Sequence, residues 1–181
     1  MGDAAARLDP DRLIEQACEL AGSDDFGDAD GWRENLSRLV DDLVAEANLS
    51  PIGVEVAAAD VIMPLRNRLQ ITHWRKDNPA VAGQRIERPI VIIGQPRTGT
   101  TILYDLLAQD PELRAPLTWE VDHPFPVPQP DTYETDPRIA ETDAQLEMVE
   151  ALMPGFMKFH PMSARSGQEC VRITAGSLCS M

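Results

Sequence analysis

The sequence has little cysteine, and its three cysteines form no recognisable framework. Cys18, Cys170 and Cys179 are odd in number and share no metal-ligand spacing. Such cysteines are typical of reduced thiols in a cytosolic protein, whereas small secreted domains carry paired ones. The acidic first residues, MGDAAARLDPDR, also lack the apolar core of a signal peptide. We therefore expect a cytoplasmic protein.

Long apolar runs and positive charge are also scarce. No stretch approaches the roughly 18 apolar residues of a membrane-spanning helix, so we expect no integral membrane segment. The formal net charge is −14, and Lys76 and Lys158 are the only lysines. Nucleic-acid-binding surfaces are normally basic, so this balance argues against a nucleic-acid partner. It does not exclude an anionic small molecule, because local charge and backbone dipoles decide that binding.

The sequence also lacks a polar tail. It stops at ITAGSLCSM, inside a segment with an amphipathic pattern and with no capping glycine beyond it. A length of 181 residues fits one domain or an incomplete one. We expect an N-terminal fragment of a longer protein, and nothing in the sequence indicates its oligomeric state.

Helical patterns dominate the first 85 residues. Asp9-Pro10 is a typical helix start, and the apolar spacing that follows predicts a helix ending at Gly22. Two further patterns, at about 30–48 and 52–77, predict two more helices, the last of them kinked at Pro64. We expect residues 1–85 to form a helical lead-in to a second domain over residues 86–181.

The stretch 88–110, RPIVIIGQPRTGTTILYDLLAQD, joins an apolar run, a glycine-bearing loop and an amphipathic run. Pro89–Ile93 predicts a strand, and residues 102–108 predict a helix directly after the loop. A loop between a strand and a helix can hold a phosphate group. Its N–H groups point inward, and the helix N-terminus adds a partial positive charge.

The loop almost fits the pattern of nucleoside-triphosphate-binding proteins, but Thr100 replaces the lysine that reaches the β- and γ-phosphates. Positive charge lies instead at Arg97. Gly99 permits close backbone approach, while Thr100 and Thr101 begin the helix where N–H groups are free. The sequence predicts an anion site with donors from Arg97 to Thr101 and argues against ordinary triphosphate hydrolysis.

Downstream, residues 113–121 predict a short second strand with its exit loop. The proline-rich segment (residues 122–136) cannot form a regular helix, and its aromatic residues favour an ordered loop. Asp136-Pro137 predicts a new helix start, and residues 169–181 predict a last helix.

The run Pro96-Arg97-Thr98-Gly99-Thr100-Thr101, followed by Leu103, Leu106 and Leu107, resembles the 5′-phosphosulfate-binding signature of sulfotransferases. The helical lead-in and Thr118-Trp119-Glu120 are similar to bacterial, particularly actinobacterial, sulfotransferase-like proteins. The resemblance implies an α/β fold, the three-layer fold of P-loop nucleotide hydrolases with a parallel sheet that is incomplete here. Residues 86–181 would then be the truncated N-terminal part of that domain.

The resemblance also implies a co-substrate, 3′-phosphoadenosine 5′-phosphosulfate, and no metal. Arg97 matches the cationic position that contacts the phosphosulfate and stabilises charge as the sulfuryl group leaves. Thr98, Gly99, Thr100 and Thr101 match positions that give backbone and hydroxyl contacts to the same phosphate. The residues that hold the donor's 3′-phosphate are expected beyond Met181, because Arg165, Ser166 and Arg172 are too isolated to assign.

Sulfuryl transfer needs a base for the acceptor's proton, and family members use a histidine or a glutamate. Glu120 is the first candidate, His123 the second and His160 the weakest. Purely structural roles compete with each: Glu120 as a helix cap or surface carboxylate, and His123 as an ordinary loop residue. Trp119 fits either the core or an acceptor wall.

We expect the acceptor to be a hydroxyl-bearing small molecule or lipid. Apolar Phe125, Phe156 and Met157 favour a hydrophobic alcohol, phenol or lipid, but they fit a place in the core equally well. Two other functions remain open. One is a P-loop phosphotransferase resembling nucleotide kinases, in which Arg97 contacts a phosphate of ATP. The other is a helical interaction module whose loop is non-functional.

Overall fold

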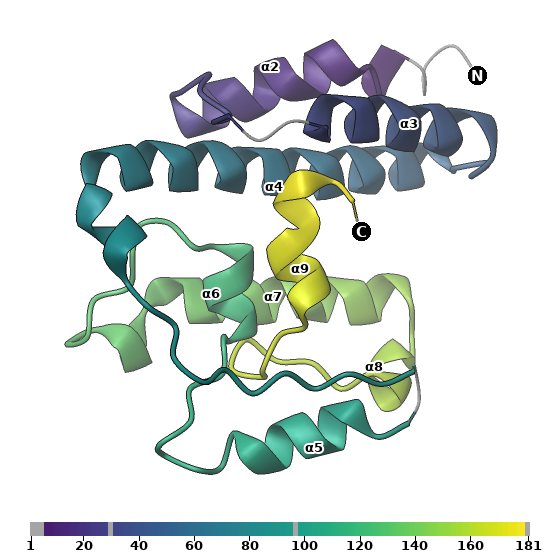
Figure 1. The fold of residues 1–181 in the computed structure, drawn as a ribbon. Coiled ribbons are helices and arrows are strands. Elements are labelled where there is room, and N and C mark those ends of the chain that lie inside the picture. The colour runs from purple at the N-terminus through teal and green to yellow at the C-terminus, as the bar shows by residue number, and fades with distance from the viewer. Residues whose placement is uncertain (1–5, 29–30, 96–97, 180–181) are drawn as a thin grey trace. The chain divides into compact units, whose positions relative to one another are not determined.

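The computed structural model describes residues 6–28, 31–95 and 98–179. The chain divides into two compact units, which are described separately. Unit 1 combines residues 1–82 with residues 170–181, and unit 2 comprises residues 83–169. Figure 1 shows the two parts, with the last residues of the chain in yellow.

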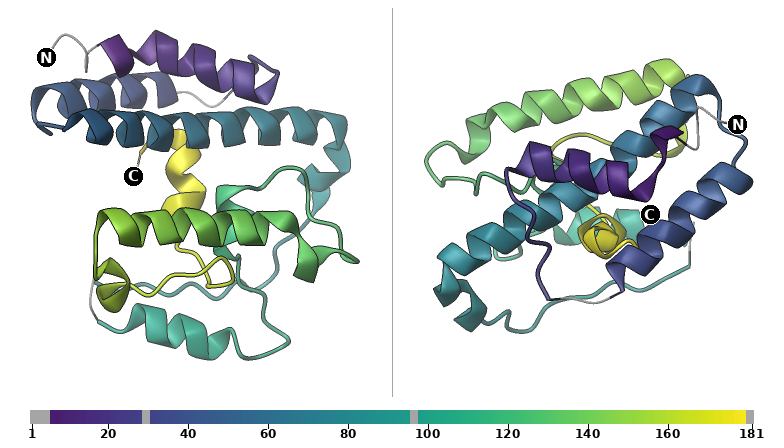
Figure 2. Two further views of the ribbon diagram at one scale, coloured as in Figure 1. Left: turned by 180° about the vertical axis from the view of Figure 1, so that it is seen from behind. Right: turned by 90° about the horizontal axis from the view of Figure 1, so that it is seen from above.

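Unit 1 is built on the three predicted helices, α2 (Pro10–Ala21), α3 (Trp32–Ala45) and α4 (Pro51–Asp77). Asp9 caps α2, its Oδ1 accepting from the Arg12 N–H at 3.0 Å, and Gly22 ends the helix at a positive φ of 65°. Helix α2 packs along α4, as Figure 2 shows from two sides. These caps are local features, so the sequence alone was sufficient to place α2.

Helix α4 begins at Ser50, whose Oγ accepts from the Gly53 N–H at 3.2 Å. Pro64 lies inside α4 without ending it. Asn78 follows the last turn, and a short 3₁₀ helix, η1 (Pro79–Gly83), comes next. The predicted helix at 52–77 is therefore confirmed to within a residue.

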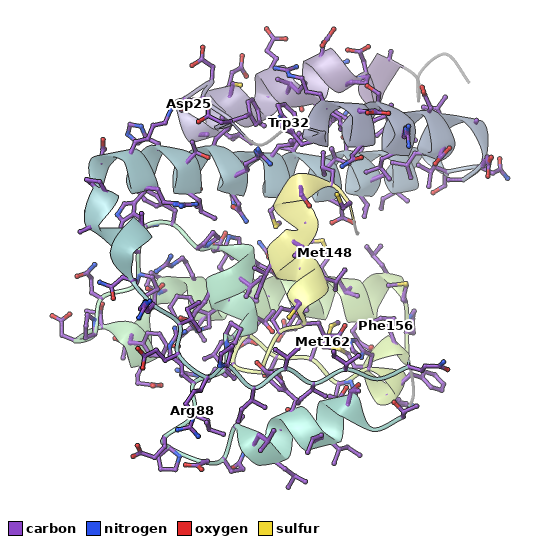
Figure 3. All side chains as sticks on the ribbon, viewed as in Figure 1. Asp25, Trp32, Arg88, Met148, Phe156 and Met162 are labelled. Atoms are coloured by element: carbon purple, nitrogen blue, oxygen red, sulfur yellow. The ribbon has the colours of Figure 1, made fainter. Side chains whose placement is uncertain are left out.

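An apolar core joins the helices of unit 1. Its most deeply buried members are Leu8, Leu13, Ala17, Leu36, Ala58, Val61, Leu65 and Leu69. Trp32 stacks on Phe26 with ring centroids 4.2 Å apart, and the guanidinium of Arg68 lies 5.6 Å from the Trp32 ring centroid. Figure 3 labels Trp32 among these helices.

The end of the chain belongs to unit 1. Helix α9 (Cys170–Thr174) passes into a 3₁₀ helix, η3 (Ala175–Ser177), so the helix predicted at 169–181 is α-helical only at its start. Leu178 is buried in the core of unit 1. Arg68 Nη1 donates to the Gly176 carbonyl at 3.1 Å, and Asn35 Nδ2 donates to the Ser177 carbonyl at 3.0 Å.

Unit 2 corrects the predicted fold class. Among the residues that the structure describes, none lies in a β-strand, so the predicted α/β fold with a parallel sheet is wrong here. Residues 89–93 have no assigned helix, strand or bridge, and Ile90, Val91 and Ile93 are exposed. An apolar run becomes a strand only when another strand takes up its backbone hydrogen bonds.

The second predicted strand, at 113–121, is also wrong, because its last part is a helix. Unit 2 contains α5 (Thr100–Leu107), α6 (Thr118–Asp122), η2 (Tyr133–Thr135), α7 (Pro137–Leu152) and α8 (Phe156–Phe159). The α7 start at Pro137 is the one predicted, with Asp136 Oδ1 accepting from the Arg138 N–H at 3.0 Å.

Residues 163–168 run beside the start of α6. The Thr118 N–H donates to the Ser166 carbonyl at 2.9 Å, and the Gln168 N–H donates to the Pro116 carbonyl at 2.9 Å. Leu117 and Gly167 form an isolated antiparallel bridge. These contacts set the position of α6, the helix that carries Glu120.

Candidate functional site

The loop that precedes α5 is tightly folded. Gly99 has a φ of +94°, a value that a glycine adopts without strain, and it is the N-cap of α5. A Cβ on Gly94 would lie 2.7 Å from Thr100 Cγ2 and 3.0 Å from Thr98 Oγ1. The backbone at Gly94 thus approaches the threonine side chains more closely than any other residue would allow.

The loop threonines differ in the hydrogen bonds they can offer. Thr98 Oγ1 donates to the Gln95 carbonyl at 2.6 Å, so its hydroxyl hydrogen is engaged within the loop. Thr100 and Thr101 occupy the first two positions of α5, where backbone N–H groups have no acceptor in the helix. Thr101 is exposed and Thr100 half-buried, so their N–H and hydroxyl groups suit an incoming anion. Arg97, predicted as the loop's cation, lies outside the described residues.

Glu120 lies in α6 and holds the start of that helix. Its Oε2 accepts from the Leu117 N–H at 3.0 Å, and its Oε1 forms an ion pair with Arg114 Nη2. The Glu120 side chain is 10% exposed, whereas that of Arg114 is 70% exposed. Glu120 therefore caps the start of α6, and the same side chain also lines a pocket.

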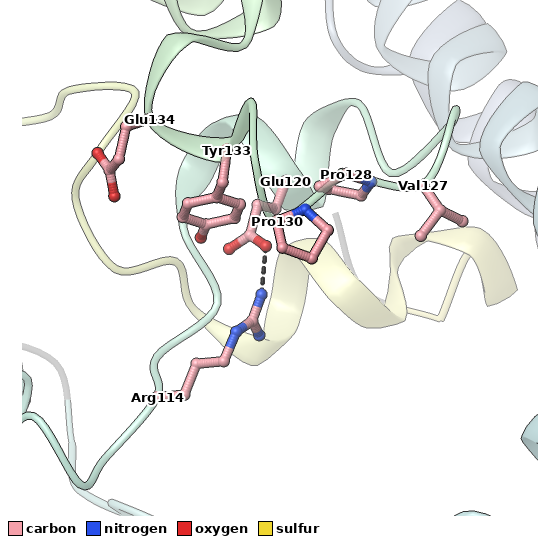
Figure 4. Close-up of a pocket in the computed structure, with 7 residues that line it drawn as sticks. All are labelled: Arg114, Glu120, Val127, Pro128, Pro130, Tyr133 and Glu134. Carbon is pink, nitrogen blue, oxygen red and sulfur yellow. Dashed lines mark hydrogen bonds and ion pairs between the residues drawn. The ribbon is translucent and has the colours of Figure 1, made fainter.

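That pocket, the Glu120 pocket, has a volume of about 480 Å³. Figure 4 shows its wall, in which charged side chains meet the proline-rich segment. Its lining residues are Arg114, Glu120, Val127, Pro128, Pro130, Tyr133 and Glu134. A volume of this size suits a small molecule.

Tyr133 places a phenol beside the Glu120 carboxylate. Burial raises the pKa of Tyr133, and the hydrogen bond and negative charge of Glu120 raise that pKa further. The Tyr133 ring also packs on Trp119, with centroids 5.3 Å apart and planes tilted by 57°. Trp119 itself is fully buried, so it belongs to the core of unit 2 rather than to the wall of the Glu120 pocket.

His123 is the C-cap of α6. It is buried, its Nε2 is 3.4 Å from Gln145 Oε1, and it is not among the residues lining the Glu120 pocket. His160 is exposed and follows α8, where its ring meets the edge of Phe156.

The structure does not bring the loop and Glu120 into one pocket. None of Thr98–Thr101 lines the Glu120 pocket. Both Figure 1 and Figure 2 show the start of α5 close to α8, whereas α6 lies over the other half of unit 2.

Sequence reasoning assigned no role to Arg114 or Arg138 and expected Tyr133 only to pack within the proline-rich segment. Arg138 is buried, and its guanidinium donates to Asp136, to the His123 carbonyl at 2.8 Å and to the Pro126 carbonyl at 2.6 Å. It thereby fastens the proline-rich segment to the start of α7. The only sequence signal for Arg138 was the Asp136-Pro137-Arg138 run. This run identifies a helix start, but it does not show that Arg138 binds the carbonyls of His123 and Pro126.

Comparison with known proteins matches this chain to one family model and to two solved structures. Residues 89–181 match the sulfotransferase family. The solved structure of sulfotransferase STF1 from Mycobacterium tuberculosis H37Rv is 34% identical, with a TM-score of 0.78 over 93% of this chain and 46% of its own. Sulfotransferase STF9 from Mycobacterium avium is 32% identical, with a TM-score of 0.81 over 94% of this chain and 44% of its own. No curated protein matches the chain.

The chain therefore belongs to the sulfotransferase family, and the predicted resemblance to actinobacterial members is confirmed. It spans less than half the length of the two solved sulfotransferases. Within the described residues, no helix combines the length and apolarity needed to cross a membrane.

Proposed function

We propose that this chain takes part in sulfuryl transfer from 3′-phosphoadenosine 5′-phosphosulfate to a hydroxyl-bearing acceptor. Family membership supports the reaction class. The choice of donor rests on the geometry of the loop. The backbone of Gly94 lies close to the side chains of Thr98 and Thr100, and the first turn of α5 follows directly. Such a turn offers N–H donors and a partial positive charge to a phosphosulfate group.

In this proposal the loop residues hold the donor. Thr98 and Gly99 act through their backbone N–H groups, since the Thr98 hydroxyl hydrogen is already donated to Gln95. Thr100 and Thr101 add N–H and hydroxyl donors. Arg97 supplies the positive charge that stabilises the bridging oxygen as the sulfur–oxygen bond breaks.

Glu120 is the proposed base for the acceptor hydroxyl, with His123 as the alternative. Exposure to a pocket supports Glu120, because a base must reach the proton it removes. His123 is buried against α7 and is the weaker choice. Transfer then requires the bound donor and Glu120 to meet, since the two do not share a pocket in this structure.

Compartment and cofactors complete the proposal. Cys18, Cys170 and Cys179 are free thiols, which suits the reducing cytoplasm. The donor is consumed as a co-substrate, and the proposed chemistry calls for no metal ion.

Isothermal titration calorimetry separates this proposal from a nucleotide kinase. The chain should bind 3′-phosphoadenosine 5′-phosphate more tightly than ATP. Arg97→Ala should weaken that binding about tenfold or more, the loss expected for one hydrogen bond to a charged group. Arg85→Ala removes an exposed arginine of unit 2 outside the loop and should leave the affinity unchanged. Tighter binding of ATP, or equal affinities for the wild-type chain and Arg97→Ala, would refute the assignment.

A further inference from the structure

Gly94 fits closely against a threonine of the loop before α5. A Cβ on Gly94 would lie 2.7 Å from Thr100 Cγ2, well inside the ordinary contact distance between two carbon atoms. The methyl group of Thr100 therefore occupies the space where a side chain at position 94 would begin. The φ angle of Gly94 lies outside the left-handed region, so crowding, and not backbone conformation, favours a glycine here.

The position of the Thr100 methyl group determines the direction of the Thr100 hydroxyl group. Both groups are attached to the same Cβ, so a contact that fixes the methyl group also fixes χ1. Threonines in helices otherwise divide between two χ1 rotamers. Thr100 is the first residue of α5, where hydroxyl and backbone N–H groups suit an anion. The contact with Gly94 therefore selects one arrangement of these groups.

Thr98 stabilises the same loop through a hydrogen bond to its backbone. Thr98 Oγ1 donates to the Gln95 carbonyl at 2.6 Å, and it would lie 3.0 Å from a Cβ on Gly94. The bond holds residues 95 and 98 together before a ligand binds. Less conformational entropy is then lost when the ligand arrives, which favours binding.

We propose that Gly94 and Thr98 are positioning residues for the phosphosulfate group. Gly94 has no side chain to touch it, and the Thr98 hydroxyl hydrogen is already engaged. Gly94 holds Thr100 in one χ1 rotamer and Thr98 holds the loop backbone, so the groups that bind the anion are arranged in advance. This inference rests on the proposed function, which makes the loop the binding site of the phosphosulfate group.

Calorimetry with 3′-phosphoadenosine 5′-phosphate tests the role of Gly94. Gly94→Ala should weaken binding about tenfold, because the added carbon displaces the Thr100 side chain from a fitted site. Thr100→Ser keeps the hydroxyl group and removes the crowding methyl group, so its affinity should stay within about threefold of wild type. In that background Gly94→Ala should cost about threefold or less, because only the approach to Thr98 Oγ1 remains.

Gly83→Ala is the matched control for Gly94→Ala. Nothing lies within 4 Å of a Cβ at position 83, so the added methyl group should leave the affinity unchanged. An equal loss from Gly94→Ala in the wild-type and Thr100→Ser backgrounds would show that the Thr100 methyl group is not the cause, and it would overturn the role of this contact.

Thr98 is tested by removing only its hydroxyl group. Thr98→Val keeps the branched shape and should weaken binding about threefold to tenfold, the usual value of one hydrogen bond. Thr98→Ser keeps the hydroxyl group and should bind as the wild type does. Thr135→Val is the matched control, because Thr135 Oγ1 donates to the Thr132 carbonyl at 3.3 Å outside the loop. Wild-type affinity in Thr98→Val, or equal losses in Thr98→Val and Thr98→Ser, would refute the role of the hydroxyl group.

Nuclear magnetic resonance of the free chain separates positioning from direct contact with the ligand. Three-bond couplings from the backbone to the Thr100 methyl carbon report its χ1 rotamer. They should indicate one rotamer in the wild type and should change or average in Gly94→Ala. Order parameters of the amides of residues 98 and 99 should fall in Thr98→Val as the loop backbone gains freedom. Averaged Thr100 couplings in the wild type, or unchanged order parameters in Thr98→Val, would overturn the corresponding positioning role.

The inference and the proposed function fail in different ways. One Thr100 rotamer in a wild-type chain that does not bind 3′-phosphoadenosine 5′-phosphate would refute the donor assignment, while the fixed loop geometry would stand. Wild-type affinity in both Gly94→Ala and Thr98→Val would refute the positioning roles and leave the donor assignment intact. Both positions are exposed, so the variants should stay folded, which circular dichroism checks. The tests of the two residues are independent, so either stands if the other variant unfolds.

Discussion

Arg138 joins the proline-rich segment to the start of α7. It is buried, pairs with buried Asp136, and donates to two carbonyls of the proline-rich segment. Replacing one partner of a buried pair leaves the other charge without compensation. The proline-rich segment would also lose its attachment to α7.

We expect Arg138→Met to lower the free energy of unfolding by about 3 kcal/mol, the usual cost of breaking a buried pair. Arg114→Met is the matched control. Arg114 is 70% exposed, and we expect its loss to cost below about 1 kcal/mol, as for surface pairs. Urea unfolding of both variants measures the difference. Equal losses of unfolding free energy in the two variants would show that the buried contacts of Arg138 stabilise the fold no more than an exposed ion pair does.

The same pair makes stability depend on pH. The hydrogen bond from Arg138 holds the pKa of Asp136 below its ordinary value of 3.8. A lowered folded-state pKa gives stability that is present above pH 3.8 and is lost as the pH falls through the folded-state pKa. Wild-type unfolding curves should therefore lose stability on acidification below about pH 4, and Asp136→Asn should flatten that part of the profile. A parallel pH profile for Asp136→Asn would contradict this cause.

Tyr133 reports directly on the Glu120 pocket. Burial, and then Glu120, raises its pKa. Glu120→Gln should lower the Tyr133 pKa without returning it to the ordinary value, because burial remains. The sequence has only two tyrosines, so a Tyr104→Phe background isolates the Tyr133 signal in an ultraviolet titration of tyrosinate. A Tyr133 pKa that does not change in Glu120→Gln would mean that the two groups do not interact.

At the scale of elements, α5 is fitted against residues 163–168 through a glycine. A Cβ on Gly167 would lie 1.6 Å from Tyr104 Cε1, and Tyr104 Oη donates to the Pro116 carbonyl at 3.3 Å. The Tyr104 ring therefore covers the backbone beside the Leu117–Gly167 bridge. Any larger residue at 167 must displace the ring.

We expect Gly167→Ala to destabilise the chain by about 1–3 kcal/mol, the range for overpacking a fitted site. The cause is specific, so it can be tested by a double-mutant cycle with Tyr104→Ala. In that background the added methyl group has room, and Gly167→Ala should cost much less. Additive losses in chemical unfolding would exclude the ring as the cause.

Elements also explain which predictions succeeded. Helices α2, α4 and α7 are specified by neighbouring residues: a capping Asp or Ser, a proline in the first turn and apolar spacing. The strands at 89–93 and 113–121 were wrong because a strand depends on a partner distant in sequence. Residues 118–122 instead form a helix that Glu120 caps through Leu117, a local bond that the alternation of apolar residues does not reveal.

In the candidate site, too, features set by neighbouring residues could be predicted, and features set by distant residues could not. The loop at 94–101 could be proposed as a phosphate site because its glycines and threonines lie close together in the sequence. The structure confirms that a helix follows the loop, beginning at Thr100, and the binding role of the loop stays a prediction. Glu120 could be named as a candidate from its short motif. Arg114 and Tyr133 could not, since nothing in the sequence shows that residues 114, 120 and 133 line one pocket.

At the scale of the whole molecule, the last residues of the chain stabilise its first helices. Leu178 is buried in the core of unit 1, and η3 contacts both α3 and α4. The helices of residues 1–82 therefore pack against residues 170–179 as well as against one another. The core of unit 1 thus joins residues separated by most of the sequence, a pairing that no local pattern could predict.

Leu178→Asp should therefore loosen helices far from it in sequence. Placing a carboxylate in the core should cost several kcal/mol, because a buried charge without a partner is strongly unfavourable. Hydrogen exchange should accelerate at amides of α3 and α4 as unit 1 opens more often. Leu152→Asp changes a leucine of unit 2 that is 51% exposed, and it should leave exchange in α3 and α4 unaltered. Protection of α4 that survives Leu178→Asp would mean that unit 1 is stable without the end of the chain.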